Sequence, residues 1–253
     1  MHITDNTILI TGGGSGIGRA LAAALHGRGN RVIIAGRHQA ALDAVVREHP
    51  GMTAATLDVT SAQDIARFSA RIASDFPTLN VVINNAGIMR AEDWNADAVD
   101  TATAEATIAT NLLAPIQLTA ALLPLLRKQA ASTVVMVSSG LAFVPRADAP
   151  TYSATKAAIH SFSESLRHQL KGTSVDVVEL APPYVQTELM SKEQASDPNA
   201  MPLQDFIDEV MRILETDPGA EEVLVQRVHR QRFAAEQGRD HYRELFGFIN
   251  GNR

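Results

Sequence analysis

The feature that most constrains the fold of this chain is a glycine-rich turn between an apolar run and a helix-forming segment. Residues 7–10 form the apolar run, the turn spans 11–18, and residues 19–25 favour a helix. Glycines at such a turn let the backbone approach a pyrophosphate, and the first N–H groups of the helix offer donors to the anion. The order of strand, glycine turn and helix predicts a dinucleotide-binding unit, with a merely flexible turn as the lesser alternative.

A second apolar run indicates which dinucleotide binds. Residues 31–35 complete a βαβ unit, and Arg37 follows where NAD-binding folds carry a carboxylate for the ribose 2′-hydroxyl. An arginine suits the 2′-phosphate of NADP, which a carboxylate would repel. We therefore expect NADP(H), with NAD(H) less favoured. Arg37 as a solvated loop residue is the alternative, and Ser15 in the glycine turn supplies no second positive charge.

Strand-like and helix-like segments alternate along the chain. This alternation predicts an α/β fold: a single Rossmann-type doubly wound domain over residues 1–253, with a parallel sheet of about seven strands and helices on both faces. Residues 186–215 are irregular, polar and then helical, and we expect them to form a substrate lid. Residues 227–250 are expected to form a C-terminal helix. The strands are expected at 7–10, 31–35, 53–57, 79–83, 133–137, 174–180 and 223–225.

Small and polar residues follow the expected strands at the point where each one ends. Asp58 and Val59 follow the third strand, residues 85–87 the fourth, Ser139 the fifth and Pro182 the sixth. Parallel strands bring these ends to one edge of the sheet, where doubly wound folds bind their ligands. Because Thr60 or Ser61 is the better helix cap, Asp58 is left free to accept a hydrogen bond from the adenine amino group.

A tyrosine and a lysine share one face of the helix that follows Ser139. Tyr152 and Lys156 lie four residues apart, which places their side chains about one turn from each other. A nearby ammonium favours the phenolate and lowers a tyrosine pKa that is ordinarily about 10. The pair is therefore a candidate acid/base with the serine hydroxyl as its partner, although such pairs also arise by chance on solvated faces.

Asn111 lies midway along an expected helix at 103–128, just before Pro115. A proline inside a helix frees backbone groups and kinks it. A kink there would expose a carbonyl and an amide near the crevice, and a core helix with a tolerated polar residue is an equal alternative.

Together these residues resemble the short-chain dehydrogenase/reductase family over nearly the whole chain. The matching motifs, in the family's order and rough spacing, are Thr11-Gly12-x-x-x-Gly16-x-Gly18, Asn84-Asn85-Ala86-Gly87, Asn111, Ser139 and Tyr152-x-x-x-Lys156. The resemblance implies that Tyr152 exchanges a proton with the substrate oxygen and that Ser139 hydrogen-bonds that oxygen. It further implies that Lys156 lowers the tyrosine pKa and binds the nicotinamide ribose, and that Asn111 holds a water. The implied cofactor-binding residues are Gly12, Ser15, Gly16, Ile17, Gly18, Arg37, Asp58, Val59, Asn85, Ala86, Gly87, Tyr152, Lys156, Pro182, Val185 and Thr187.

The sequence departs from the family after the sixth strand. Pro183 stands where the family usually has glycine, and proline stiffens the loop, while Val185 and Thr187 match positions that contact the carboxamide. The Ala35–Arg37 turn, the double proline and the Arg/Phe-rich end resemble a bacterial branch often called DltE-type. The expected substrate is a medium-sized, partly hydrophobic carbonyl compound, with or without an acidic group. Its expected pocket is lined by Leu141, Arg146, Tyr184, Met190 and aromatic side chains of the last helix.

The composition of the chain argues against several other classes of function. The net charge of −6 argues against nucleic acid and anionic membrane as partners, and the absence of cysteine excludes thiol catalysis. Segment 111–126 is too short and too interrupted to span a membrane. The short polar N-terminus leaves no room for a cleaved signal, so a cytoplasmic enzyme is expected. The eight histidines show no metal-ligand clustering, so no metal is expected.

Two other classes of function were weighed against an enzyme of this family. A sensor that binds NADP(H) without turnover would not need the whole set of Asn111, Ser139, Tyr152 and Lys156. A sugar-nucleotide epimerase or dehydratase fits poorly, because the glycine spacing differs and no sizeable substrate domain follows. The family resemblance also implies a homodimer or homotetramer.

Overall fold

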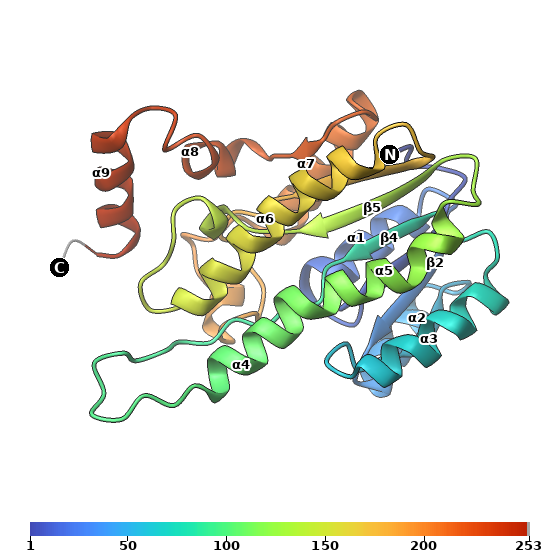
Figure 1. The fold of residues 1–253 in the computed structure, drawn as a ribbon, viewed down its shortest axis with the longest axis horizontal. Coiled ribbons are helices and arrows are strands. Elements are labelled where there is room, and N and C mark those ends of the chain that lie inside the picture. Colours follow the sequence, from blue (N-terminus) through green and yellow to red (C-terminus); the bar gives the residue numbers. More distant parts are fainter. Residues whose placement is uncertain (252–253) are drawn as a thin grey trace.

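The computed structural model describes residues 1–251 and is organised around one parallel sheet. The expected doubly wound α/β fold is confirmed, with strands in the order β3-β2-β1-β4-β5-β6-β7 (Figure 1). The order reverses between β1 and β4, which places a crevice at their carboxyl ends. The strands are β1 (Thr7–Thr11), β2 (Arg31–Gly36), β3 (Thr53–Thr56), β4 (Val81–Asn84), β5 (Ser132–Val137), β6 (Val175–Leu180) and β7 (Glu222–Val223).

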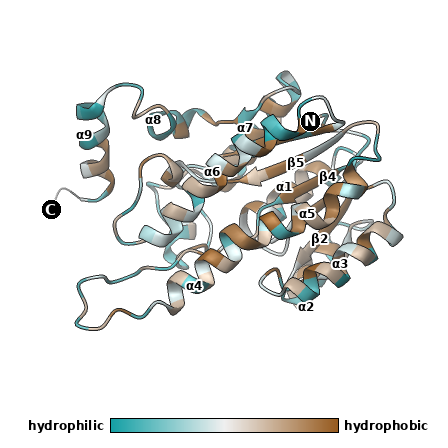
Figure 2. Ribbon diagram, viewed as in Figure 1, coloured by the Kyte–Doolittle hydropathy of each residue, from teal (hydrophilic) through white to brown (hydrophobic). Residues whose placement is uncertain are grey.

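Helices cover both faces of the sheet. Along β1, Ile8 and Ile10 enter one hydrophobic cluster, and Leu9 enters the cluster on the opposite face. Burial on both faces explains why the strands are continuous apolar runs, and hydrophobic residues dominate them in Figure 2. One face carries α1 (Gly16–His26), α2 (Gln39–Glu48) and α7 (Leu203–Thr216), and the other carries α3 (Ala62–Asp75), α5 (Ala114–Leu126) and α6 (Pro150–Leu170).

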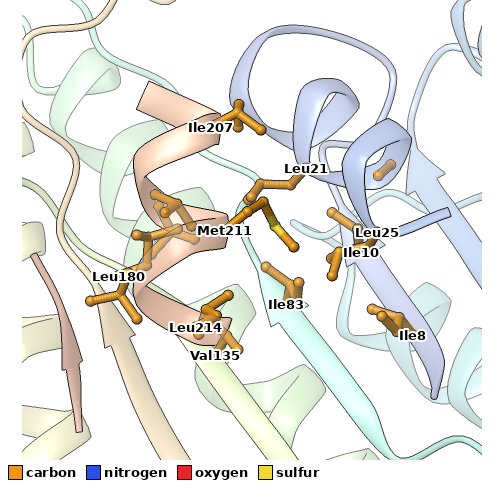
Figure 3. Close-up of a cluster of buried hydrophobic side chains, with 14 of the residues drawn as sticks. Ile8, Ile10, Leu21, Leu25, Ile83, Val135, Leu180, Ile207, Met211 and Leu214 are labelled. Atoms are coloured by element: carbon orange, nitrogen blue, oxygen red, sulfur yellow. The ribbon is translucent and has the colours of Figure 1, made fainter. Parts of the chain in front are cut away.

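The helix α7 belongs to the hydrophobic core, which corrects the lid expected at 186–215. Its residues Ile207, Met211 and Leu214 are buried in one cluster with side chains of α1 and of the strands (Figure 3). Burial of each such side chain stabilises the folded state by roughly 1.5–3 kcal/mol. The helical half of the expected lid is therefore fixed to the sheet. The prediction of a lid still applies to the segment 186–202.

The C-terminal segment contains two helices where one was expected at 227–250. They are α8 (His229–Arg232) and α9 (Arg239–Ile249), preceded by a 3₁₀ turn at Gln226–Val228. Gly238 has a φ of 102°, a left-handed conformation that a continuing helix cannot contain. In Figure 1, α9 lies at one end of the molecule, beyond α8.

The helical stretch that carries Asn111 is continuous. It consists of α4 (Ala102–Ile108), a π-helical turn (Ala109–Leu113) and α5, so a π turn takes the place of the expected kink. Within residues 1–251, the stretch Ala102–Leu126 is long and apolar enough to cross a membrane by length and composition, a test that core helices also pass. It is longer than the segment 111–126 on which the sequence argument against a span rested.

Candidate active site

The glycine turn packs directly on the loop after β4. Gly12 has a φ of 69°, and a Cβ added there would lie 2.8 Å from Asn85 Nδ2. A Cβ at Gly18 would collide with that same amide and with the carbonyl oxygen of Gly12. Larger residues are excluded at both positions because the two loops touch. Gly18 therefore acts by closing the turn onto its neighbour.

Thr11, which the sequence argument quoted only as part of a motif, ties these two loops together. Its buried hydroxyl oxygen accepts hydrogen bonds from the backbone N–H groups of Asn85 and Ala86, each at 3.0 Å. The Asn85 amide in turn donates to the Thr11 carbonyl at 2.9 Å. The sequence feature that could have indicated this role is a threonine immediately before the first glycine of the turn.

A first cavity of about 610 Å³ opens at the carboxyl ends of β1, β4, β5 and β6. It brings together most of the residues predicted for cofactor binding and three of the four predicted for catalysis. These are Gly12, Ser15, Gly16, Ile17, Asn85, Ala86, Gly87, Ser139, Tyr152, Lys156, Pro182, Val185 and Thr187.

The predicted adenosine end lies outside this cavity. Arg37 and Asp58 are exposed after β2 and β3, and Val59 is buried in the hydrophobic cluster below them. Hydrogen bonds from the hydroxyl and backbone of Thr60 hold the pKa of Asp58 below its ordinary value, and the charge of Arg37 contributes less. The Asp58 Oδ1 atom is thus engaged by Thr60 at 2.7 and 2.9 Å, so the carboxylate is not as free as expected. Ser61 caps α3, as the sequence allowed.

Asn111 is buried in the π turn, where its side chain binds the backbone of the loop that follows β4. Its Oδ1 accepts from the Ile88 N–H at 2.9 Å, and its Nδ2 donates to the Ile88 carbonyl at 2.8 Å. A Cβ added at Gly87 would lie 3.4 Å from Asn111 Oδ1 and 3.8 Å from Lys156 Nζ. Asn111 and Lys156 therefore both face this glycine.

Ser139 and Tyr152 meet where β5 ends and α6 begins. Ser139 opens a short 3₁₀ turn (Gly140–Ala142) and its Oγ accepts from the Leu141 N–H at 3.1 Å. Tyr152 is 6% exposed. Burial raises the pKa of Tyr152 to about 12, and a hydrogen bond with Ser139 opposes that rise.

The expected lowering of the Tyr152 pKa by Lys156 is therefore wrong for this arrangement. The ammonium lies 5.6 Å from the centre of the tyrosine ring and donates to the Val137 carbonyl at 2.7 Å. Its own burial lowers the pKa of Lys156 to about 8, while the nearby charge of Glu179 raises it. Burial has the largest influence on the pKa of both groups, because it removes each of them from water.

Behind Lys156 lies a charged cluster that the sequence did not indicate. Glu179 is fully buried on β6, and His160 Nδ1 lies 2.7 Å from its Oε2. His160, Glu179 and Glu222 offer ligand atoms within 4.8 Å of one another. Arg232 binds both oxygens of Glu222, at 2.7 and 3.0 Å. The Arg232 guanidinium thus already pairs with Glu222, and His160 is the partner of Glu179.

A second cavity of about 770 Å³ adjoins the first. Ser139 and Tyr152 line both cavities, as do Pro183 and Val185. The four pocket residues predicted by number lie in its wall: Leu141, Arg146, Tyr184 and Met190. Of the aromatic side chains expected from the last helix, Phe248 lies in this wall, whereas Tyr242 and Phe246 do not. The sequence argument missed Arg227, Arg230 and Gln231, because nothing in their spacing connects them to Tyr152.

Gln194 holds the loop between the two cavities and was also missed. It lies in a 3₁₀ turn (Glu193–Ser196) and is buried. Its Nε2 donates to the Val185 carbonyl at 2.9 Å and to Thr187 Oγ1 at 3.2 Å, and its Oε1 accepts from the Met190 N–H at 3.1 Å. A glutamine in an irregular polar segment gives no periodic signal.

The first cavity fits a nicotinamide dinucleotide. The glycine turn presents backbone N–H groups at the start of α1, which suits a pyrophosphate. Ser138 is one of the lining residues, and its buried Oγ has no hydrogen-bond partner among the described residues. Lys156 and Tyr152 place an ammonium and a hydroxyl in the same wall. These donors and one unsatisfied hydroxyl match the polar groups of such a cofactor.

Comparison with known proteins assigns the family. The family model described as short chain dehydrogenase matches residues 6–198. The chain belongs to this family. It is 43% identical over 194 residues, 77% of each chain, to the uncharacterized oxidoreductase DltE of Bacillus subtilis strain 168. The expected likeness to the DltE-type branch is thereby confirmed, and the dehydrogenase is an oxidoreductase of the NAD(P)-dependent type.

Solved structures of short-chain dehydrogenases share the fold. One from Burkholderia cenocepacia J2315, in complex with NADP, is 25% identical with a TM-score of 0.81, over 98% of this chain and 99% of that one. One from Burkholderia phymatum, in complex with NAD, is 20% identical with a TM-score of 0.80, over 97% of this chain and 96% of that one. Proteins of this fold therefore bind either dinucleotide.

Proposed function

We propose that this dehydrogenase uses NADP(H) to interconvert a carbonyl compound and a secondary alcohol, with Tyr152 as the proton donor and acceptor. The observation that carries the proposal is that Ser139 and Tyr152 line both cavities. A carbonyl oxygen that enters from the second cavity meets both hydroxyls at the boundary with the first. When bound in the first cavity, the cofactor supplies or accepts the hydride.

Burial of Tyr152 favours reduction at neutral pH. A phenol with a pKa of about 12 keeps its proton, so it is ready to donate that proton to the oxygen of a carbonyl group. Ser139 fixes the same oxygen by a second hydrogen bond. Alcohol oxidation instead needs the phenolate, so its rate is expected to rise with pH across the alkaline range.

Lys156 has a positioning and a proton-carrying role in this proposal. Its ammonium is anchored on the Val137 carbonyl at 2.7 Å, which leaves two of its donors for ribose hydroxyls. A pKa lowered to about 8 lets the amine take up and release a proton near neutral pH. Asn111, which also faces Gly87, fixes the backbone of Ile88 through two hydrogen bonds.

Arg37 supports NADP(H) as the cofactor. The guanidinium is exposed at the carboxyl end of β2, beside the position where the adenosine ribose lies in dinucleotide folds. A guanidinium binds a phosphate through two parallel hydrogen bonds. A 2′-phosphate suits this side chain, which supports the choice of NADP(H).

The alternative of a non-catalytic NADP(H) sensor is less well supported. A binding protein needs the glycine turn and Arg37. It has no use for a buried tyrosine hydrogen-bonded to a serine at the mouth of a second cavity.

A panel of aldehydes, ketones and secondary alcohols tests the proposal. Each carbonyl compound is mixed with protein and NADPH or NADH, each alcohol with NADP⁺ or NAD⁺, and the change in nicotinamide absorbance is followed. We expect turnover of at least one compound class, faster with NADPH than with NADH. Tight NADPH binding by fluorescence without turnover of any compound would contradict the enzyme and support the sensor.

A further inference from the structure

The second cavity carries a positive charge that contrasts with the chain around it. Its wall contains Arg146, Arg227 and Arg230, and Asp197 is the one carboxylate among its described lining residues. The chain as a whole has a formal net charge of −6. An excess of guanidinium groups in one hollow of an acidic protein attracts anions to that hollow.

The single carboxylate in the wall is engaged by groups other than these arginines. Asp197 accepts hydrogen bonds from the Tyr184 hydroxyl at 2.9 Å, and from the Asn199 backbone and side-chain amides at 2.8 and 3.0 Å. Arg146 is paired with Asp148 at 2.7 Å, outside the wall. Arg227 and Arg230 form no ion pair within residues 1–251. Arg227 in the 3₁₀ turn and Arg230 in α8 are therefore the two charged groups left to bind a ligand.

The two guanidinium groups keep donors free for an anion. The Arg230 guanidinium lies 4.8 Å from the centre of the Phe248 ring. Packing on an aromatic ring uses the face of a guanidinium and leaves its N–H edge available. Arg227 donates one hydrogen bond to the Asn199 carbonyl, and a guanidinium has five N–H donors in all. The two arginines are three positions apart, across the junction of the 3₁₀ turn with α8, a spacing that places side chains on the same side of a helix.

Much of the rest of the cavity wall is apolar, although Gln194, Asn199 and Gln231 also line it. Leu141, Met89 and Met190 pack against Tyr152 in one small cluster, and Leu245, Phe248 and Ile249 contribute from α9. A molecule that fills about 770 Å³ thus meets the hydroxyls of Ser139 and Tyr152, apolar side chains, and the guanidinium groups of Arg227 and Arg230.

We propose that Arg227 and Arg230 bind an anionic group, a carboxylate or a phosphate, at the end of the substrate remote from the reacting carbonyl. The substrate class is therefore a carbonyl compound or alcohol with an apolar body and one anionic end. This assignment rests on the proposed function, because the carbonyl end is placed at Tyr152. The anion site itself can be measured without turnover.

Three matched ligands test the assignment: benzoylpropionate, which is an aryl ketone with a carboxylate end, its uncharged methyl ester, and the phosphonate analogue. Their affinities are measured by isothermal titration calorimetry, and their reduction is measured with NADPH. The wild-type protein should bind an anionic ligand at least about tenfold more tightly than the ester, since hydrogen bonds to charged groups contribute that much. Comparison of the affinities of the phosphonate and the carboxylate shows which anion the site prefers.

Three variants and a matched control locate the effect. Arg230→Gln, Arg227→Gln and the double variant each keep a polar side chain while removing charge. Arg243→Gln removes the same charge from an exposed position of α9 that is not in the cavity wall. We expect the advantage of the anion over the ester to fall in both single variants, to vanish in the double variant and to be unchanged in Arg243→Gln.

The outcomes separate this site from the proposed reaction. Equal affinity for anion and ester in the wild type, or an unchanged advantage in the double variant, would overturn the anion site even if ketones are reduced. An advantage that depends on Arg227 and Arg230 supports the site, even if no probe is reduced. In that case the proposed reaction would fail and the anion site would stand.

Discussion

The two cavities of this dehydrogenase are built from the chain in different ways. The wall of the first comes mostly from strand ends, where short motifs at Gly12, Asn85 and Ser139 follow β1, β4 and β5 directly. The wall of the second joins the turn after β5 to the loop 186–202 and to segments beyond residue 226. The cofactor side thus follows from a sheet that places successive strand ends together, whereas the substrate side depends on how distant loops pack.

The largest expected effect is on the cofactor side, at Gly18. Gly18→Ala places a Cβ against the Gly12 carbonyl and the Asn85 amide. It should reduce the unfolding free energy by about 3 kcal/mol and weaken NADPH binding about a hundredfold, because backbone has to move. The control is Gly27→Ala at the other end of α1, where the nearest atom to an added Cβ is 3.4 Å away. Equal, small effects of both variants in chemical denaturation would show that the two loops do not constrain each other.

The next effect distinguishes the two cofactors. Arg37→Ala should weaken NADPH binding roughly 10- to 100-fold and leave NADH binding nearly unchanged, because one charge-assisted contact to the 2′-phosphate is lost. Fluorescence titration with both cofactors measures this. An unchanged preference in the variant would remove Arg37 from the cofactor site.

Gln194 tests whether the substrate side depends on one buried amide. Gln194→Ala leaves the Val185 carbonyl and the Met190 N–H without their partner. We expect this loss to cost about 1 kcal/mol, so the KM for the carbonyl substrate should rise about fivefold. Gln204→Ala, which removes an exposed glutamine on α7, is the control. Steady-state kinetics in which both variants match the wild type would mean that the loop is held by other contacts.

The smallest effect concerns the pair of His160 on α6 and Glu179 on β6. The hydrogen bond to Glu179 raises the pKa of His160 above its ordinary 6.5, with Glu164 adding to this and Arg232 opposing it. Because the folded-state pKa is the higher one, the pair stabilises the fold fully below about pH 6.5 and loses that contribution as pH rises through the folded value. His160→Gln should cost about 1 kcal/mol at pH 6 and less at pH 8.

Urea denaturation at both pH values measures this difference. The control is His168→Gln, which removes an exposed histidine from the same helix. A cost for His160→Gln that grows with pH would contradict the assigned charge state.

The sequence was sufficient to predict the sheet, because its strands are apolar runs bounded by glycines and polar residues. The same reasoning placed Tyr152 near Ser139, since helical spacing and the end of β5 are both local. It failed on the direction of the Tyr152 pKa. Burial decides that direction, and burial depends on the loops that pack over the tyrosine from elsewhere in the chain.

Other errors of the prediction lie in the C-terminal third. The apolar spacing of α7 marks a core helix, yet the irregular segment before it led to a lid that included it. Gly238 was a visible break in the last helix that the prediction passed over. Arg227 and Arg230 reach the site only because α8 packs beside the turn after β5. No spacing within the sequence encodes that contact.

The account rests on Tyr152 as the group that exchanges a proton at the boundary of the two cavities, and Tyr152→Phe tests it most directly. The variant loses one hydroxyl and keeps the ring that packs against Met89 and Ala149. Single-turnover hydride transfer from NADPH to an accepted ketone, measured by stopped flow, should slow at least about a hundredfold, the usual contribution of a general acid. NADPH affinity should stay within about threefold of the wild type, since the loss is of one hydrogen bond at most. Hydride transfer at the wild-type rate in this variant would contradict the account.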